Sequence, residues 1–199
     1  MRIEIAGALS CGKSTLAGLL AADGHKVIYE DLSTNPYLDL RVQDPEKYDF
    51  LCQRQFVLDK ISSLQAAEEA GAPYFSDFSV AAERAYVSHY VAHRPDWIGE
   101  LFALLERSEV EQGLPDLLIH LQCTPEEQIN RIRIRGRDFE QGHDVAFLRN
   151  INDRVDAQVR RVADMGVPVA AFRTDLLSWS EIMGSLSDRL QALSSAVAA

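Results

Sequence analysis

The sequence contains little cysteine and no long apolar run, and both absences limit what the protein can be. Its 199 residues include three cysteines, Cys11, Cys52 and Cys123. Three scattered thiols are too few for a disulfide framework, and their spacing is not that of a zinc site. No apolar run approaches the roughly 18 residues that suggest a membrane span. The first apolar stretch carries Glu4 and is unlike a secretion signal, so we expect a cytoplasmic protein that does not enter a membrane.

Positive charge is also scarce. Twenty Lys and Arg face thirty Asp and Glu, which gives a formal net charge of −10 at pH 7. A general duplex-DNA binder needs a surplus of cations against phosphate, so we predict no nucleic-acid partner. A local basic pocket for a small anion is still compatible with this balance. The composition, 47% apolar and 25% charged, is that of an ordinary globular protein, and the length predicts one domain over residues 1–199.

Short apolar runs alternate with longer helical patterns along the chain. The runs suit strands buried on both faces, and they cover residues 3–6, 26–29, 73–76, 117–121 and 167–172. The helical patterns cover residues 13–22, 45 to about 70, 80–93, 97–112, 125 to about 136, 145–164 and 179–193. Strands that alternate with helices predict an α/β fold with a five-stranded parallel sheet and helices on both faces. The tail at 194–199 is predicted to fray.

The clearest motif follows the first predicted strand. Residues 7–14 match the phosphate loop G-x-x-x-x-G-K-[ST], with a strand before it and an amphipathic helix after it. Gly7 and Gly12 allow backbone N–H groups to point into one concavity, where the helix start adds partial positive charge. Lys13 is expected to reach the β- and γ-phosphates of a nucleoside triphosphate, and Ser14 to ligate Mg²⁺. The predicted nucleotide-binding residues of this motif are Gly7, Ala8, Leu9, Ser10, Cys11, Gly12, Lys13, Ser14 and Thr15.

A cluster of arginines follows the fourth predicted strand. Its members are Arg131, Arg133, Arg135 and Arg137. Arg131 and Arg135 share a helix face, and Arg137 lies beyond the helix in a loop. The cluster can be a solvated basic surface or a nucleic-acid patch, but in an acidic chain with a phosphate loop we favour a lid. Its arginines would stabilise charge on the transferring phosphate. Thr124 and Glu127 are predicted to form a reciprocal capping box at the start of this helix.

Several fragments together resemble one known family. Residues 124–142, which end in Arg-Gly-Arg-Asp-Phe-Glu-Gln-Gly, resemble the lid of the deoxynucleoside kinases, the family of deoxycytidine, deoxyguanosine and deoxyadenosine kinases. Further fragments resemble that family in the same order, and they lie at residues 29–31, 35–38, 44–53 and 115–121. The resemblance implies a P-loop kinase fold with an arginine-rich lid at about 131–142. It also implies ATP and Mg²⁺ as cofactors and a homodimer or a heterodimer with a paralogue.

The resemblance also implies roles for individual residues. Glu30 corresponds to the general base that accepts the proton of the nucleoside 5′-hydroxyl. Without the resemblance, Glu30 is an acid at a strand end, where open α/β sheets bind ligands. Gln53 corresponds to the base-reading glutamine, and its amide can read a base edge bidentately. The implied donor-side residues are Lys13, Arg131, Arg135 and Arg137. The implied acceptor-side residues are Glu30, Gln53, Asp77 (which is also close to Mg²⁺), Glu83 and Glu140.

Two positions depart from the family pattern. The family usually has an arginine directly after the acid that ends the third strand, where this chain has Phe78, and a tyrosine at or near Val42. We therefore expect another cation to occupy the space of that arginine, either Lys60, Arg84 or an arginine of the lid. Other aromatic side chains are assigned to the core and to helix interfaces, among them Tyr86, Trp97 and Phe102.

The sequence thus predicts phosphate transfer from ATP to the 5′-hydroxyl of a deoxynucleoside in nucleotide salvage. A purine is favoured because the fragments most resemble bacterial deoxyadenosine and deoxyguanosine kinases. Two alternatives stay open. One is a small-molecule or nucleoside monophosphate kinase, which should carry further arginines for the acceptor phosphate. The other is a catalytically weak nucleotide-binding subunit of a heteromeric kinase, which Phe78 and Val42 keep open.

Overall fold

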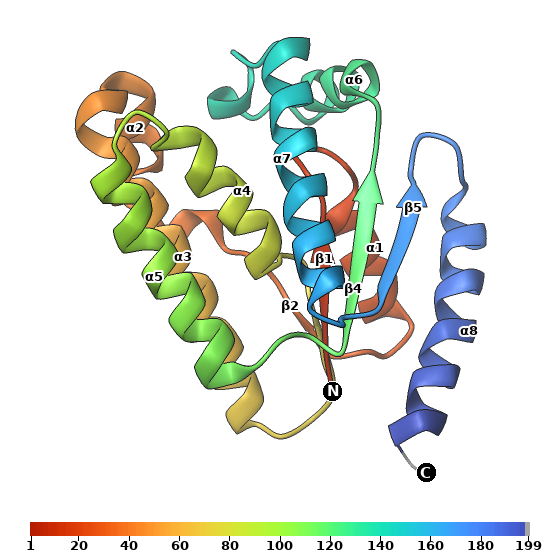
Figure 1. Cartoon of the computed structure of the whole chain (residues 1–199). Coiled ribbons are helices and arrows are strands. Elements are labelled where there is room, and N and C mark those ends of the chain that lie inside the picture. The colour runs from red at the N-terminus through yellow and green to blue at the C-terminus, as the bar shows by residue number, and fades with distance from the viewer. Residues whose placement is uncertain (198–199) are drawn as a thin grey trace.

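The computed structural model describes residues 1–197 and arranges them as a parallel sheet covered by helices (Figure 1). The strands are β1 (Arg2–Ala6), β2 (Val27–Ile28), β3 (Tyr74–Ser76), β4 (Leu117–Gln122) and β5 (Val169–Arg173). They lie in the order β2-β3-β1-β4-β5, and every neighbouring pair is parallel. The predicted α/β fold with a five-stranded parallel sheet is confirmed.

The central strands are buried on both faces, as the apolar runs predict. β1 and β3 are buried at every position, and only the last residue of β4 is partly accessible. The edge strands differ, because β2 is half-buried at both of its residues and β5 alternates between buried and accessible side chains. The prediction of two buried faces is therefore wrong for β2 and β5, since each has a neighbouring strand on one side only.

Eight α-helices and two 3₁₀ turns connect and follow the strands within residues 1–197. The helices are α1 (Lys13–Ala22), α2 (Leu38–Gln43), α3 (Pro45–Glu69), α4 (Val80–Tyr90), α5 (Pro95–Gln112), α6 (Pro125–Arg135), α7 (Val145–Asp164) and α8 (Trp179–Val197), and the turns are η1 (Leu32–Thr34) and η2 (Asp138–Glu140). The short elements α2, η1 and η2 have too few residues for a periodic pattern and were not predicted. No helix in this part of the chain has the length and apolar content to cross a membrane.

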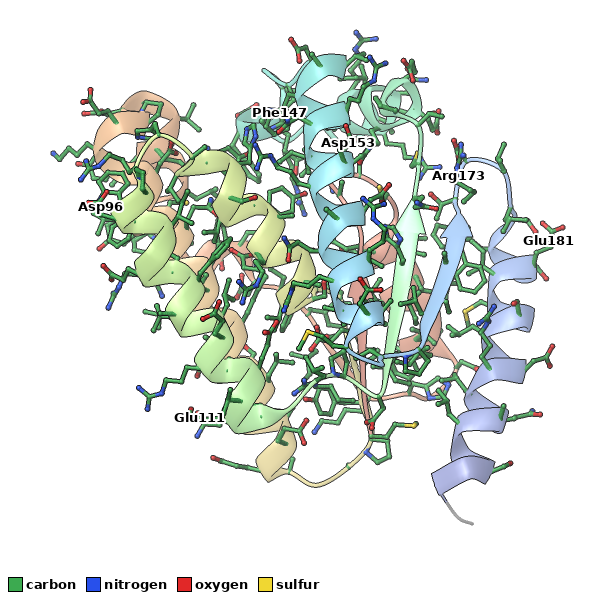
Figure 2. The ribbon with its side chains drawn as sticks, viewed as in Figure 1. Asp96, Glu111, Phe147, Asp153, Arg173 and Glu181 are labelled. Atoms are coloured by element: carbon green, nitrogen blue, oxygen red, sulfur yellow. The ribbon has the colours of Figure 1, made fainter. Side chains whose placement is uncertain are left out.

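The C-terminal helix is longer than predicted. It continues to Val197, so the predicted frayed end is wrong for residues 194–197, while residues 198–199 lie outside the described chain. In Figure 1, α7 crosses the front of the sheet and α1 lies behind it, as predicted for a sheet with helices on both faces. Charged side chains at the helix surfaces, such as Asp96, Glu111 and Glu181, point outward (Figure 2).

Two apolar clusters hold the layers together. The larger one joins the sheet to α1, α4, α7 and α8 and includes Ile5, Leu16 and Ile119. The smaller one lies among α3, α4 and α5, and Trp97 and Phe102 pack against it, as predicted. Because all strands are parallel, their carboxyl ends meet at one edge of the sheet, where open α/β folds bind ligands. The phosphate loop follows β1 at this edge, Glu30 follows β2, and Asp77 follows β3.

Candidate functional site

A cavity of about 960 Å³, counting the space at its open mouth, lies at the carboxyl edge of the sheet. It brings together side chains from the phosphate loop, the ends of β2 and β3, the helices α3 and α4, and the lid. The predicted site residues that line it are Gly7, Leu9, Ser10, Lys13, Ser14, Glu30, Gln53, Asp77, Glu83, Arg135, Arg137 and Glu140. The remaining predicted residues, Ala8, Cys11, Gly12, Thr15 and Arg131, do not belong to its lining.

The phosphate loop leaves the start of α1 free for an anion. Gly12 caps the helix in the left-handed region, with φ 96°, and no side chain caps the first N–H groups. Such unpaired N–H groups and the helix dipole favour a phosphate. Gly7 is needed for a close approach, because a Cβ at this position would lie 2.7 Å from the carbonyl oxygen of Leu121 in β4. Gly12 is therefore required for the backbone conformation at the helix cap, and Gly7 for close packing against β4.

Gly12→Ala is expected to destabilise the protein more than Gly136→Ala. Both glycines have positive φ, 96° and 69°, so alanine costs about 1–2 kcal/mol of backbone strain at either one. A Cβ at Gly12 would also lie 2.7 Å from the ring of Trp179, whereas nothing lies within 4 Å of a Cβ at Gly136. Moving Trp179 adds at least about 1 kcal/mol.

Urea denaturation of both variants measures this difference in the free energy of unfolding. Trp179 fluorescence, read in a Trp97→Phe background, should change in Gly12→Ala and stay unchanged in Gly136→Ala. Equal losses of stability in the two variants would show that Trp179 does not restrict this position.

The polar groups beside the loop suit a triphosphate and Mg²⁺. Lys13 Nζ donates to the carbonyl oxygens of Gly7 and Ala8 at 2.9 and 3.0 Å, so its ammonium group already lies at the loop. Ser14 Oγ donates to Asp77 Oδ2 at 3.3 Å. Hydroxyl and carboxylate oxygens are the ligands that Mg²⁺ prefers, and it commonly takes only one or two of them from the protein and the rest from water and phosphates. Groups of three or more His, Cys, Asp or Glu side chains that could hold a metal are absent from the described chain.

Asp77 connects this region to Glu30. The backbone N–H of Glu30 donates to Asp77 Oδ1 at 2.6 Å, while the other oxygen of Asp77 accepts from Ser14. Burial, together with the negative charge of Glu30, raises the pKa of Asp77 above its ordinary value. A bound Mg²⁺ would reverse this tendency, because a cation favours the ionised carboxylate.

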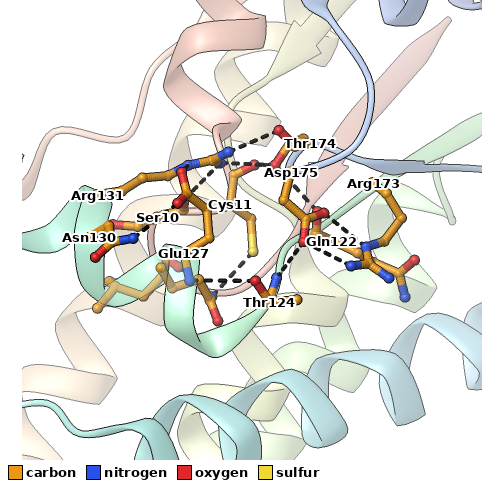
Figure 3. Close-up of polar contacts among 12 residues, drawn as sticks. Ser10, Cys11, Gln122, Thr124, Glu127, Asn130, Arg131, Arg173, Thr174 and Asp175 are labelled. Atoms are coloured by element: carbon orange, nitrogen blue, oxygen red, sulfur yellow. Dashed lines mark hydrogen bonds and ion pairs between the residues drawn. The ribbon is translucent and has the colours of Figure 1, made fainter.

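Arg131 ties the phosphate loop to the segment after β5 (Figure 3). Its guanidinium group donates to the carbonyl oxygen of Ser10 at 3.3 Å, and to Thr174 Oγ1 and Thr174 O, both at 2.9 Å. Arg131 shares a helix face with Arg135, but these contacts hold its guanidinium group at Ser10 and Thr174. Arg131 therefore does not line the cavity. Its position supports the shape of the loop.

The capping box at the start of α6 is only half formed. The N–H of Glu127 donates to Thr124 Oγ1 at 3.4 Å, as predicted. The reciprocal bond is absent, because the Glu127 side chain accepts from Arg131 Nε at 3.0 Å. Asp175 Oδ2 accepts from the N–H of Thr124 instead, at 3.1 Å. The prediction of a reciprocal box is therefore wrong, since Arg131 binds the Glu127 side chain and Asp175 binds the N–H of Thr124.

The lid arginines are held together by one buried acid. Arg135 forms an ion pair with Glu140, and Arg137 Nη1 lies 3.4 Å from Glu140 Oε1. Arg135 also donates to Ser10 Oγ at 2.8 Å, which places its guanidinium group over the phosphate loop. Glu140 is 1% exposed, so its charge stays close to both arginines. Glu140 thus pairs with both arginines, and Arg135 reaches the phosphate loop.

Two buried side chains in the lining of the cavity have oxygen atoms without a hydrogen-bond partner. Gln53 and Glu83 are 2% and 4% exposed. Gln53 Oε1 and Glu83 Oε1 have no hydrogen-bond partner among the described residues. Burial raises the pKa of Glu83, despite the opposing charge of Lys60. A buried acceptor without a partner costs about 1–3 kcal/mol, so a ligand with N–H groups would gain by pairing with these atoms.

Other residues of the cavity were not predicted. Tyr86 packs against the larger apolar cluster, as predicted, and it also lines the cavity. Arg41, from the unpredicted helix α2, lies 3.8 Å from the centre of the Tyr90 ring and donates to Asp49 at 2.9 Å. Phe56, Phe78 and His143 also line the cavity. Apart from Phe78, which departs from the family pattern, no sequence pattern marked these side chains, because a single arginine or aromatic has many possible surroundings.

Lys60 is the cation that lies beside Glu30. It forms ion pairs with Glu30 and with Glu83. Arg84, another of the expected substitutes, pairs instead with Glu106 and Glu109 at 3.5 and 3.6 Å. Phe78 is 3% exposed and packs in the smaller apolar cluster. Val42, the other position that departs from the family pattern, is 59% exposed and does not line the cavity.

The parallel sheet, the phosphate loop between β1 and α1, and the arginine lid define a P-loop kinase fold. Solved structures agree on the fold: deoxyadenosine kinase from M. mycoides with bound dCTP has a TM-score of 0.80 and 17% identity, covering 96% of this chain and 100% of that chain. The deoxynucleoside kinase family model matches residues 3–189. The chain belongs to the deoxynucleoside kinase family.

Curated relatives carry related names. A deoxyguanosine kinase of Lactobacillus acidophilus is 31% identical over 147 residues, which cover 70% of this chain and 64% of the relative. A deoxyguanosine kinase of Lactobacillus johnsonii is 29% identical over 70% of this chain and 66% of the relative. A deoxyadenosine/deoxycytidine kinase of Bacillus subtilis is 30% identical over 77% of this chain and 74% of the relative. The chain thus spans just under two thirds of the two Lactobacillus proteins.

Proposed function

We propose that this protein transfers the γ-phosphate of ATP to the 5′-hydroxyl of a purine deoxynucleoside, a step of nucleotide salvage. The observation that carries the proposal is a continuous chain of contacts across one cavity. It begins at Ser14 on the phosphate loop and passes through Asp77, Glu30 and Lys60 to the buried Glu83. A donor phosphate at one end and a nucleoside base at the other would place the acceptor hydroxyl next to Glu30.

The donor side uses the phosphate loop and the lid. Lys13 and the N–H groups at the start of α1 bind the β- and γ-phosphates, and Ser14 and Asp77 would hold Mg²⁺. Mg²⁺ supplies charge neutralisation between the phosphates when it is bound. Arg135 and Arg137 leave Glu140 and donate to the γ-phosphate oxygens, where negative charge spreads in the transition state.

Glu30 acts as the general base. Its carboxylate accepts the proton of the 5′-hydroxyl while the oxygen attacks phosphorus, and the bond to the departing ADP breaks. Burial raises the pKa of Glu30, but the charge and hydrogen bond of Lys60, together with Lys13 and Arg137, outweigh burial and lower it overall. An ionised but weakly basic carboxylate is sufficient if the transition state is loose.

The acceptor side reads the nucleoside. Gln53 and Glu83 present unpaired oxygens to N–H groups of a base, and Glu140, once released by the arginines, accepts from the sugar 3′-hydroxyl. The names of the Lactobacillus relatives support a purine. The carboxylates of Glu30 and Asp77 disfavour a nucleoside monophosphate, whose 5′-phosphate would lie beside them.

A substrate panel tests the proposal. The purified protein is assayed with ATP and Mg²⁺ against the four deoxynucleosides and their monophosphates. Activity on deoxyadenosine or deoxyguanosine, and on no monophosphate, is expected. Turnover of monophosphates alone would indicate a nucleoside monophosphate kinase. ATP binding without turnover of any acceptor would indicate a nucleotide-binding subunit that needs a partner.

The protein works as a single domain over residues 1–199, with its lid at 131–142, and acts in the cytoplasm without nucleic acid or membrane. The net charge of −10 supports the absence of nucleic acid from its partners. It pairs with a second copy or with a paralogue, and light scattering of the purified chain, alone and with such a paralogue, decides between the two.

A further inference from the structure

Lys60 is a buried cation between two acids from different elements. It extends from α3, and its side chain is 9% exposed. It donates to Glu83 Oε2 on α4 at 2.6 Å and pairs with Glu30, which follows β2. The rings of Phe56 and Phe78 lie 4.9 and 6.0 Å from its ammonium nitrogen. A charged group in such surroundings is costly unless it stays paired, so both carboxylates fix its position.

Several charged groups face Glu30 from the elements around it. The acids are Asp77, after β3, and Glu83 on α4, and the cations are Lys60 on α3, Lys13 on α1 and Arg137 in the lid. Lys13 is directed to the loop carbonyls, and Arg137 is paired with Glu140. Among the described residues, Lys60 is therefore the cation in direct contact with the Glu30 carboxylate.

We propose that Lys60 is a positioning residue for phosphoryl transfer, which directs the Glu30 carboxylate toward the acceptor hydroxyl and offsets the charge of the acids around it. The proposal rests on the proposed function of this cavity. Glu30 is held at two points: its backbone N–H by Asp77, and its side chain by Lys60. Asp77, Glu83 and the phosphates of ATP would otherwise repel its charge.

The geometry explains why a phenylalanine can follow Asp77. The side chain of Phe78 packs into the cluster among α3, α4 and α5 and cannot donate a hydrogen bond. Lys60 enters from α3 and brings its ammonium group to the acids across the Phe78 ring. Lys60 can therefore supply the charge that position 78 does not, while the apolar packing beneath the site is kept.

The proposal is tested with Lys60→Met, Lys60→Arg and the exposed control Lys47→Met. Loss of a charge-assisted contact should lower kcat about tenfold to a hundredfold in Lys60→Met, with little change in ATP affinity, because Glu30 and Glu83, the partners of Lys60, lie outside the phosphate loop. The Kd of the nucleoside should change less than kcat, because Lys60 acts on the Glu30 carboxylate and not on the phosphate donor. Lys60→Arg should restore most of kcat, because it returns a cation to the same pair of acids.

Two results would overturn the proposal: wild-type kcat in Lys60→Met, or a loss of kcat that Lys60→Arg does not restore although both variants fold. A second measurement does not depend on folding of a variant or on turnover. A crystal structure of the wild-type protein with a bound deoxynucleoside should show Lys60 Nζ within hydrogen-bond reach of the Glu30 carboxylate. A Glu30 carboxylate without this contact would refute the pairing with Lys60. An inactive wild-type protein that keeps the contact would refute the proposed function and leave the pairing intact.

Discussion

Replacing Glu30 with glutamine is expected to lower kcat for a purine deoxynucleoside about a hundredfold to ten-thousandfold, the usual contribution of a general base. Glutamine keeps the shape of the side chain and removes the proton acceptor. Asp77 can still accept from the backbone N–H at this position, because that bond does not use the side chain. We therefore expect the Kd of the nucleoside, measured by calorimetry, to change little while steady-state assays record the loss of kcat.

Glu100→Gln is the matched control for this substitution. Glu100 is exposed and lies 3.5 Å from Arg54, so its replacement removes the same charge from the surface of α5. Its kcat should equal that of the wild-type protein. If Glu30→Gln keeps kcat within a few-fold of the wild-type value, Glu30 has a structural role and the base lies elsewhere.

Lys13→Ala is expected to lower ATP-dependent turnover about a hundredfold to a thousandfold, as for the loss of one preorganised donor to transition-state charge. Its ammonium group now donates to the carbonyl oxygens of Gly7 and Ala8, and it must turn from them to reach a phosphate. The side chain contributes no packing to either apolar cluster, so the fold should survive. Coupled assays measure turnover, calorimetry measures ATP affinity, and circular dichroism reports the fold.

Lys47→Ala serves as the control, because Lys47 is an exposed lysine in the first turn of α3. It should bind ATP and turn over substrate as the wild-type protein does. Unchanged turnover in a folded Lys13→Ala protein would refute the phosphate-loop assignment.

The elements that the sequence predicted best are those with a strong local cause. The helix α1 spans Lys13–Ala22 as predicted, because it combines a motif-defined start with a regular apolar face. The helix α3 begins at Pro45 after Asp44, whose side chain accepts from the N–H of Lys47. Two short elements were predicted less well: β2 is shorter than the predicted 26–29, and α2 was not predicted, because so few residues carry no periodicity and tertiary contacts decide their limits.

Site residues also divide into those that one stretch of sequence predicts and those that depend on tertiary contacts. The phosphate loop was predictable because its chemistry uses the backbone of adjacent residues, so the whole motif is visible in one stretch. Tyr86 and Arg41 were not, because their roles depend on which helices meet around the cavity. Arg131 was predicted from the lid pattern, yet its guanidinium group pairs with Ser10 and Thr174, which lie far away in the sequence.

The sequence by itself determined the fold class, from the alternation of apolar runs with helical patterns, and the phosphate-loop motif and the resemblance to a family, from residue types at short spacings. Only the tertiary structure decided which cation would lie beside Glu30. Lys60, Arg84 and the lid arginines were all candidates, and the packing of α3 and α4 brought Lys60 between Glu30 and Glu83 while Arg84 turned to Glu106 and Glu109. The choice depends on distances between elements, since a buried charge takes the partner within its reach.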